Sequence, residues 1–164
     1  MNIRIWMCAG IFGLIASSSL VVKDVSAHGG ATGIVKQRMD AMSEMARSMK
    51  TIGGMVRSKT PYDAEAVRKA AAYMELHGGT ELTKLFPEGS LMKPSEAKPD
   101  IWQDWETFKA QADDLKNSAA VLKDMSGNGL ASLGADGVLS VRQAFAAVGK
   151  TCSACHQKFR IKKD

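Results

Sequence analysis

Two cysteines and a histidine near the end of the chain are the residues whose spacing best predicts a chemistry. Cys152 and Cys155 are three positions apart, and His156 follows the second cysteine directly. On a helix, such positions share one face, about 5–6 Å apart at Cβ, so both thiols can reach one flat ligand. A C-x-x-C-H motif is typical of c-type haem attachment, in which the thiols bond the haem vinyl groups and the histidine binds the iron. We therefore predict one covalent haem c on these three residues.

Other interpretations explain less of this motif. A zinc site normally has four ligands, commonly as two closely spaced pairs, whereas the third cysteine, Cys8, lies in a segment that we expect to be removed. The chain's histidines are His28, His77 and His156, and no two of them are closely spaced. A thioredoxin-like redox pair follows a strand, and nothing before Cys152 has that pattern. A structural disulfide would leave His156 without a role.

The first 27 residues have the pattern of a secretory signal peptide. Arg4 supplies a positive start, residues 5–22 are almost all apolar or small, and Val25-Ser26-Ala27 matches a cleavage site. The apolar run is nearly long enough for an uncleaved membrane anchor, which is the alternative. Export agrees with the motif, because covalent haem attachment in bacteria takes place outside the cytoplasm. We predict a periplasmic protein with residues 28–164 as one domain and no membrane attachment after cleavage.

Charge gives no indication of a nucleic-acid partner. The chain has 22 Lys and Arg against 17 Asp and Glu, a formal net charge of +5. The charges are interspersed without a long run of one sign, and such a distribution is not typical of nucleic-acid-binding proteins.

Four stretches have apolar residues at alternating spacings of three and four, which is the period of an amphipathic helix. The first covers residues 34–58. The second has Thr60 as its N-cap and Pro61 as its first residue, and it ends at Gly78-Gly79. A connection over residues 80–99 follows, which is long for a compact domain.

The third stretch is capped by Asp100 and ends before the glycine-rich residues 126–137. The fourth runs from Val138 to Phe159 and carries both cysteines on its apolar face. Four amphipathic helices of this length bury their apolar faces best as an antiparallel bundle. We therefore predict an all-α, antiparallel four-helix bundle with one covalently bound haem inside it.

Three motifs resemble the class II c-type cytochromes, the cytochrome c-prime family. They are CSACHQKFR at Cys152–Arg160, the R-x-x-x-M pattern of Arg38–Met42 on the first predicted helix, and KPDIW at Lys98–Trp102. A haem motif at the C-terminal end of a helical chain distinguishes this family from other cytochromes. The resemblance extends over the whole of residues 28–164. It implies a haem held by the two cysteines, with His156 as the proximal iron ligand.

The resemblance also bears on the distal side of the iron. Met42 matches the position whose methionine binds iron in low-spin members. The c-prime proteins proper leave the iron five-coordinate, and some of them also have methionine there. Spacing alone favours core packing of Met42 beside Met45 and Met49, because methionine fills irregular space well. With the resemblance, we expect His156 and Met42 as axial ligands, with Met39 and Met45 as the alternatives to Met42.

Two arginines stand out. Arg38 occupies an apolar-face position, where an unpaired buried charge is unfavourable, so we expect it to bind a haem propionate. The alternative is that Arg38 reaches solvent from the helix end. Arg160 follows His156 by one turn, where it either tunes the iron electrostatically or interacts with the helix dipole.

The expected function is electron transfer between redox partner proteins by a monohaem c-type cytochrome, since methionine ligation raises the haem potential. The alternative is a five-coordinate cytochrome c-prime that binds nitric oxide or carbon monoxide. We do not expect an enzyme, because no distal histidine or arginine arranged for peroxide cleavage is recognisable. Members of the family often pair through their first two helices, which makes a homodimer a further expectation.

Overall fold

Helices make up most of residues 30–131 and 138–162, the part of the chain that the computed structural model describes. The long ones are α1 (Gly33–Val56), α2 (Ala64–Leu76), α5 (Trp105–Asp124) and α6 (Val141–Phe159). The short ones are α3 (Gly79–Thr83), α4 (Asp100–Gln103) and a 3₁₀ turn at Met125–Gly127. Within the described ranges, β pairing is limited to an isolated bridge between Ala97 and Arg160. The expected all-α fold is confirmed.

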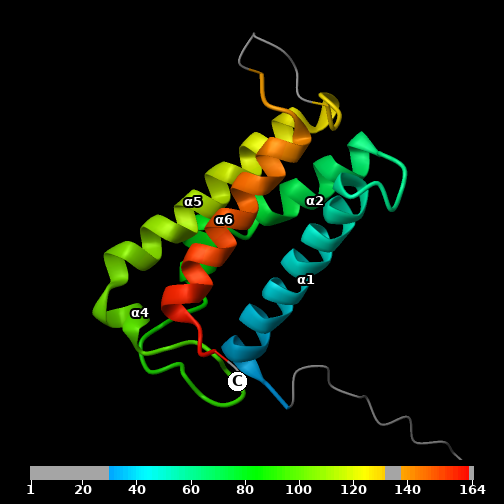
Figure 1. Cartoon of the computed structure of the whole chain (residues 1–164). Helices are drawn as coiled ribbons and strands as arrows, with labels where there is room; N and C mark the ends of the chain where they lie inside the picture. Colours follow the sequence, from blue (N-terminus) through cyan, green and yellow to red (C-terminus); the bar gives the residue numbers. More distant parts are fainter. Residues whose placement is uncertain (1–29, 132–137, 163–164) are drawn as a thin grey trace, which may run out of the picture.

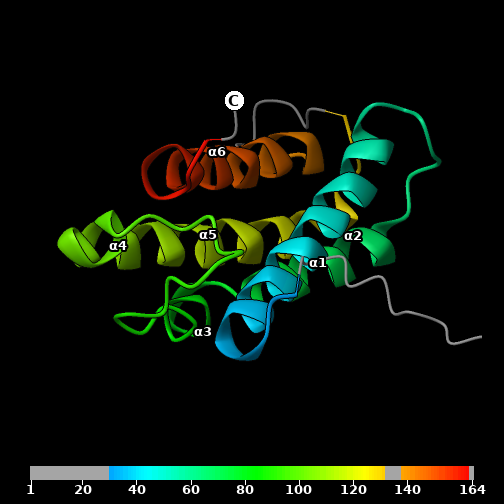
Figure 2. The ribbon, with the colours of Figure 1, turned by 90° about the horizontal axis from the view of Figure 1, so that it is seen from below.

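The four long helices run alternately up and down as an antiparallel bundle (Figure 1). α2 packs along α5, α5 packs along α6, and α1 packs on α2. α1 and α6 make few contacts with each other. Figure 2 shows the bundle from below, with α1 inclined relative to α5 and α6. The α2–α5–α6 side is therefore closely packed, whereas α1 and α6 leave space between them.

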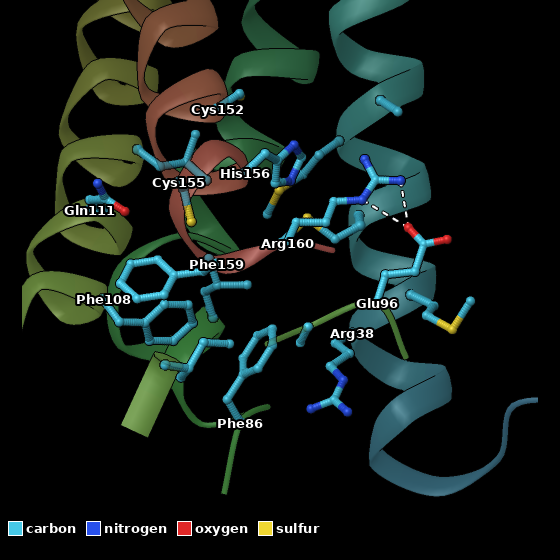
Figure 3. Close-up of a pocket in the computed structure, with 18 of the residues that line it drawn as sticks. Arg38, Phe86, Glu96, Phe108, Gln111, Cys152, Cys155, His156, Phe159 and Arg160 are labelled. Atoms are coloured by element: carbon cyan, nitrogen blue, oxygen red, sulfur yellow. Dashed lines mark hydrogen bonds and ion pairs between the residues drawn. The ribbon is translucent and has the colours of Figure 1, made fainter. Parts of the chain in front are cut away.

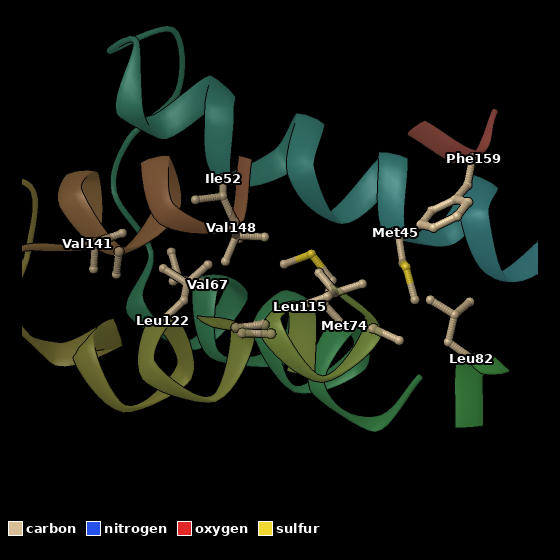
Figure 4. Close-up of a cluster of buried hydrophobic side chains, with 14 of the residues drawn as sticks. Met45, Ile52, Val67, Met74, Leu82, Leu115, Leu122, Val141, Val148 and Phe159 are labelled. Carbon is tan, nitrogen blue, oxygen red and sulfur yellow. The ribbon is translucent and has the colours of Figure 1, made fainter. Parts of the chain in front are cut away.

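Apolar side chains from all four long helices form one core (Figure 4). Its members include Met45, Ile52, Val67, Met74, Leu115, Leu122, Val141, Val148 and Phe159. Fully burying one such side chain contributes about 1.5–3 kcal/mol. All of these residues lie on the helix faces expected from the spacing of apolar residues, so the predicted core faces are confirmed.

The start of α2 differs from the sequence prediction. Asp63, not Thr60, is the N-cap, and Pro61 precedes the helix. The carboxylate of Asp63 accepts hydrogen bonds from the backbone N–H groups of Glu65 at 2.9 Å and Ala66 at 3.0 Å. Aspartate is a stronger N-cap residue than threonine. Because its carboxylate satisfies two free N–H groups, α2 begins three residues later than predicted.

The start of α6 also differs. The prediction placed Val138 in the helix, but α6 begins after Ser140, and Val138 is 43% exposed. Ser140 and Gln143 form a capping box, in which each side chain accepts a hydrogen bond from the other residue's backbone N–H. This reciprocal pairing fixes the start of the helix that carries both cysteines.

The third predicted helix is divided in two. Asp104 leaves helical geometry at φ −130° and ψ 55°, which separates α4 from α5. Its carboxylate pairs with the ammonium group of Lys158 on α6. Aspartate competes with helical backbone bonding through its short polar side chain, and here the ion pair connects the start of α5 to the end of α6.

The loop between α3 and α4 (residues 84–99, hereafter the α3–α4 loop) is held to α1 by Arg38, which is only 3% exposed. Nη1 of Arg38 donates to the Leu85 carbonyl at 3.2 Å and to the Ser90 hydroxyl at 3.1 Å. Nη2 donates to the Ser95 hydroxyl at 3.2 Å and to the Ser90 carbonyl. One side chain of α1 therefore forms hydrogen bonds with three separate residues of the loop.

The other end of the α3–α4 loop is joined to the end of α6. The backbone N–H of Lys98 donates to the Phe159 carbonyl at 2.9 Å, and that of Ile161 donates to the Glu96 carbonyl at 2.7 Å. The guanidinium of Arg160 pairs with the Glu96 carboxylate at 2.6 and 2.9 Å. The loop thus bridges α1 and α6, the two neighbouring long helices that contact each other least.

No helix in residues 30–131 or 138–162 is both long and apolar enough to cross a membrane. The predicted signal peptide, residues 1–27, lies outside the described residues, and so does its proposed cleavage site. The division of the chain at residue 28 remains a prediction.

Gly78, between α2 and α3, allows α5 to approach closely. A Cβ atom at this position would lie 2.9 Å from the backbone nitrogen of Lys116 and 3.0 Å from its Cα. The φ angle of Gly78 is −85°, which any residue adopts. The requirement for glycine here is therefore steric.

Replacing Gly78 by alanine should lower the free energy of unfolding by about 1–3 kcal/mol, because the new methyl group forces α5 away from the corner. Urea denaturation measures this change. Gly127→Ala is the matched control, since a Cβ atom there meets nothing within 4 Å. Equal effects of the two substitutions would contradict the steric explanation.

Replacing Arg38 by lysine should lower the free energy of unfolding by about 3 kcal/mol, because one ammonium cannot satisfy the carbonyl and hydroxyl groups that the guanidinium now bonds. Urea denaturation gives the total effect, and amide hydrogen exchange should show faster exchange in the α3–α4 loop. Arg47→Lys is the control, because the side chain of Arg47 is 72% exposed and pairs with Glu44 at the surface. Unchanged exchange in the loop would show that Arg38 does not hold it.

Candidate functional site

A cavity of about 660 Å³ lies between α1, α5, α6 and the α3–α4 loop (Figure 3). Its size is within the range of about 300–1,000 Å³ that is typical of cofactor sites. Most of its lining is apolar, including Met42, Phe108, Leu115 and Phe159. The cavity occupies the space that α1 and α6 leave between them, so the inclination of α1 creates the site.

Cys152, Cys155 and His156 line this cavity together. The two cysteines are half-buried, not fully buried as the apolar spacing indicated, because they face the cavity. Burial raises the pKa of both thiols, and the pKa of Cys155 reaches about 11, with the neighbouring Cys152 as a second cause. Both thiols are therefore protonated at neutral pH, and neither is disposed to act as an exposed nucleophile.

His156 lines the cavity and is exposed. Enough of its ring lies against protein atoms for burial to lower its pKa, and the positive charge of Arg160 lowers it further. The imidazole is consequently neutral at pH 7. A neutral imidazole has a free nitrogen lone pair, which is the form that binds a metal.

Met42 lines the same cavity from α1 and is half-buried. Met39, Met45 and Met49 line it as well, so one helix contributes a row of thioethers to this wall. The structure brings Met42 and His156 to one cavity from two different helices. It places both alternative ligands, Met39 and Met45, on the same wall.

Arg38 also lines the cavity. The alternative that it reaches solvent is wrong, since it is 3% exposed. Its guanidinium lies 4.8 Å from the ring centroid of Phe86 and bonds the α3–α4 loop. These partners were not expected from the sequence. Both Nη groups are already engaged, so a propionate has to share these donors or use Nε, and the propionate contact remains a prediction.

Two further residues at the cavity were missed by the sequence analysis. Glu96 pairs with Arg160 beside His156 (Figure 3). It lies in the predicted connection over residues 80–99, which has no apolar periodicity, and no feature of the sequence indicated a role for it. Gln111 interrupts the apolar face of α5 next to Ala112, and this polar residue on an apolar face was a signal that could have been used.

The residues around the cavity fit a covalent haem. Cys152 and Cys155 present two thiols from one helix face, and His156 adds a neutral imidazole to a largely apolar space. In the described residues, no group of three or more His, Cys, Asp or Glu side chains is placed to hold a metal ion. A site built from protein ligands alone, such as the zinc alternative, therefore has no support here.

Comparison with known proteins identifies relatives of the whole bundle. The family model described as Cytochrome C′ matches residues 33–160. Cytochrome c-556 of Agrobacterium tumefaciens is 35% identical over 131 residues, which cover 80% of this chain and 99% of the relative.

Solved structures agree. Cytochrome c′ from Rhodobacter Spheriodes matches with a TM-score of 0.67 and 27% identity, covering 79% of this chain and 96% of that one. The nitric oxide complex of a mutant cytochrome c prime from Alcaligenes xylosoxidans matches with a TM-score of 0.65 and 25% identity, covering 79% and 94%. Since the family match runs from the first residue of α1 to the residue after α6, this chain belongs to the cytochrome c′ family, the class II c-type cytochromes, whose cofactor is covalent haem c.

Proposed function

We propose that this protein is a periplasmic electron carrier in which Cys152 and Cys155 hold haem c, with His156 and Met42 as axial iron ligands. The observation that carries the proposal is the presence of Met42 and His156 in the walls of one cavity, on α1 and α6 respectively. The haem supplies one-electron chemistry, and a methionine ligand gives it a higher potential.

The surrounding residues suit this role by holding the two ligand helices in place. The capping box at Ser140 fixes the start of α6, and Val148 anchors that helix in the core one turn before Cys152. Arg38 ties α1 to the α3–α4 loop, which in turn is bonded to the end of α6. A rigid ligand set keeps reorganisation small when the iron gains or loses one electron.

A second candidate function is the binding of nitric oxide or carbon monoxide by five-coordinate iron. The structural relative from Alcaligenes xylosoxidans in complex with nitric oxide favours it. In this case His156 alone binds the iron, and Met42 packs in the distal wall beside Met45 and Met49. The apolar lining of the cavity is consistent with a small uncharged ligand.

The remaining expectations stay part of the proposal. The pattern of residues 1–27 and the place of haem attachment in bacteria support a periplasmic location. We propose redox proteins as partners, no enzymatic activity, and a homodimer formed through α1 and α2. Arg38 is retained as the residue that contacts a propionate.

Replacing both Cys152 and Cys155 by serine should abolish covalent haem attachment, because no thiol remains to add to the vinyl groups. The variant is produced in a host able to mature c-type cytochromes, and its haem is tested for extraction into acidified organic solvent. Each single variant should retain one thioether bond. Ser153→Ala, between the two cysteines, is the control and should keep its haem. Haem that resists extraction from the double variant would contradict the assignment.

Replacing Met42 by leucine should convert six-coordinate to five-coordinate iron, because leucine has a similar volume and no sulfur. The visible spectrum should lose the sharp bands of the reduced protein and the weak far-red band of methionine–iron coordination, and carbon monoxide should now bind. Met39→Leu and Met45→Leu are the matched controls on the same wall and should leave the spectrum unchanged. A wild-type protein that already binds carbon monoxide would favour the second function.

A further inference from the structure

Gln111 of α5 contains an unusual atom. Its Oε1 is the one buried side-chain oxygen or nitrogen, among the residues that the structure describes, that has no hydrogen-bond partner. Gln111 lines the cavity that holds Cys155. Figure 3 shows the amide oxygen on the side of Gln111 nearer Cys155, and the amide nitrogen turned away from Cys155. The negative end of an unsatisfied amide, covered by protein atoms, is therefore directed towards the side of the cavity that carries Cys155.

Local packing does not explain this carbonyl. The neighbours of Gln111 on the same face of α5 are Phe108, Ala112 and Leu115, and all three are buried and apolar. An apolar side chain at position 111 would complete this face and would leave no polar atom unpaired. Burying a carbonyl without a partner is unfavourable, and such an atom in a folded protein requires an explanation.

Hydrogen bonding to the haem does not explain it either. The edge of haem c that bonds the cysteines has only carbon substituents and sulfur, with no N–H or O–H group to donate to Oε1. The propionates lie at the opposite edge of the macrocycle and, as carboxylates, accept hydrogen bonds. A hydrogen bond to the haem therefore does not account for this carbonyl.

We propose that Gln111 lowers the reduction potential of the haem by directing the negative end of its amide dipole at it. Reduction adds one electron from a redox partner to ferric iron, and no bond forms or breaks. Ferric haem has one more positive charge than ferrous haem, so a fixed negative dipole end stabilises the oxidised state. The apolar lining screens this interaction poorly, which makes a single dipole effective.

The inference rests on haem attachment at Cys155, which is part of the proposed function, but not on the identity of the sixth ligand. Gln111 is a tuning residue, since it touches no reacting atom. A dipole effect alters the redox equilibrium without changing the iron ligands. A structural role would instead alter the iron coordination when Gln111 is replaced.

The test is a spectroelectrochemical titration of the haem-loaded Gln111→Met protein with a one-electron mediator. Methionine keeps the length of the side chain and removes the amide. We expect the redox equilibrium to shift about threefold towards reduced haem, a potential about 30 mV higher at 59 mV per tenfold change for one electron. Gln111→Asn, which retracts the carbonyl by one methylene, should give a smaller shift in the same direction.

Gln103→Met is the matched control, because Gln103 is an exposed glutamine at the end of α4 and does not line the cavity. It should leave the potential unchanged. An unchanged or lower potential in Gln111→Met would overturn the proposal, and so would a change in its visible spectrum, which would show altered iron coordination. If the wild-type protein binds carbon monoxide, the proposed electron-carrier function is refuted. The Gln111 proposal is then still tested, because the shift in potential remains measurable.

Discussion

The separation of α1 from α6 is the constraint on which the rest of the structure depends. A helix that carries a cofactor on its buried face cannot pack on its neighbour along its whole length. α6 meets this requirement in two halves: Val141, Ala144 and Val148 are buried in the core, whereas Cys152 and Cys155 face the cavity. The inclination of α1 opens the bundle only beside the second half.

Helices that share few contacts need another connection, and here the α3–α4 loop provides it. Arg38 binds the loop to α1 with hydrogen bonds to Leu85, Ser90 and Ser95. Backbone bonds and the Glu96–Arg160 pair join it to the end of α6. α5 and α6 are held together by direct packing. α1 and α6 are instead connected through this loop, which is long for a compact domain.

Apolar spacing predicted the bundle and its core faces, because the positions of Ile52, Leu122 and Val148 follow directly from helix geometry. The C-x-x-C-H motif predicted which helix carries the site. Helix boundaries were less predictable. They depend on hydrogen bonds between the side chains of Asp63 and Ser140 and backbone N–H groups, and the spacing of apolar residues carries no information on such bonds.

Contacts between distant residues could not be predicted at all. Glu96 and Arg160 are 64 positions apart, and the partners of Arg38 lie 47–57 positions away in a stretch without periodicity. The sequence indicated that Arg38 needed a partner on its apolar face, but not that Leu85, Ser90 and Ser95 would bond it.

The same architecture bears on the proposed coordination of the iron. In the proposed coordination, whether Met42 reaches the iron depends on the distance between α1 and α6, and these two helices share few direct contacts. The bonds of Arg38 and the Glu96–Arg160 pair connect the two helices through the α3–α4 loop. Since an exposed ion pair such as Glu96–Arg160 is weaker and more easily changed than a packed core, small changes in the α3–α4 loop can move the methionine wall without altering the bundle. The α3–α4 loop is thus, beside the identity of the distal residue, a second determinant of whether the proposed methionine ligand can reach the iron.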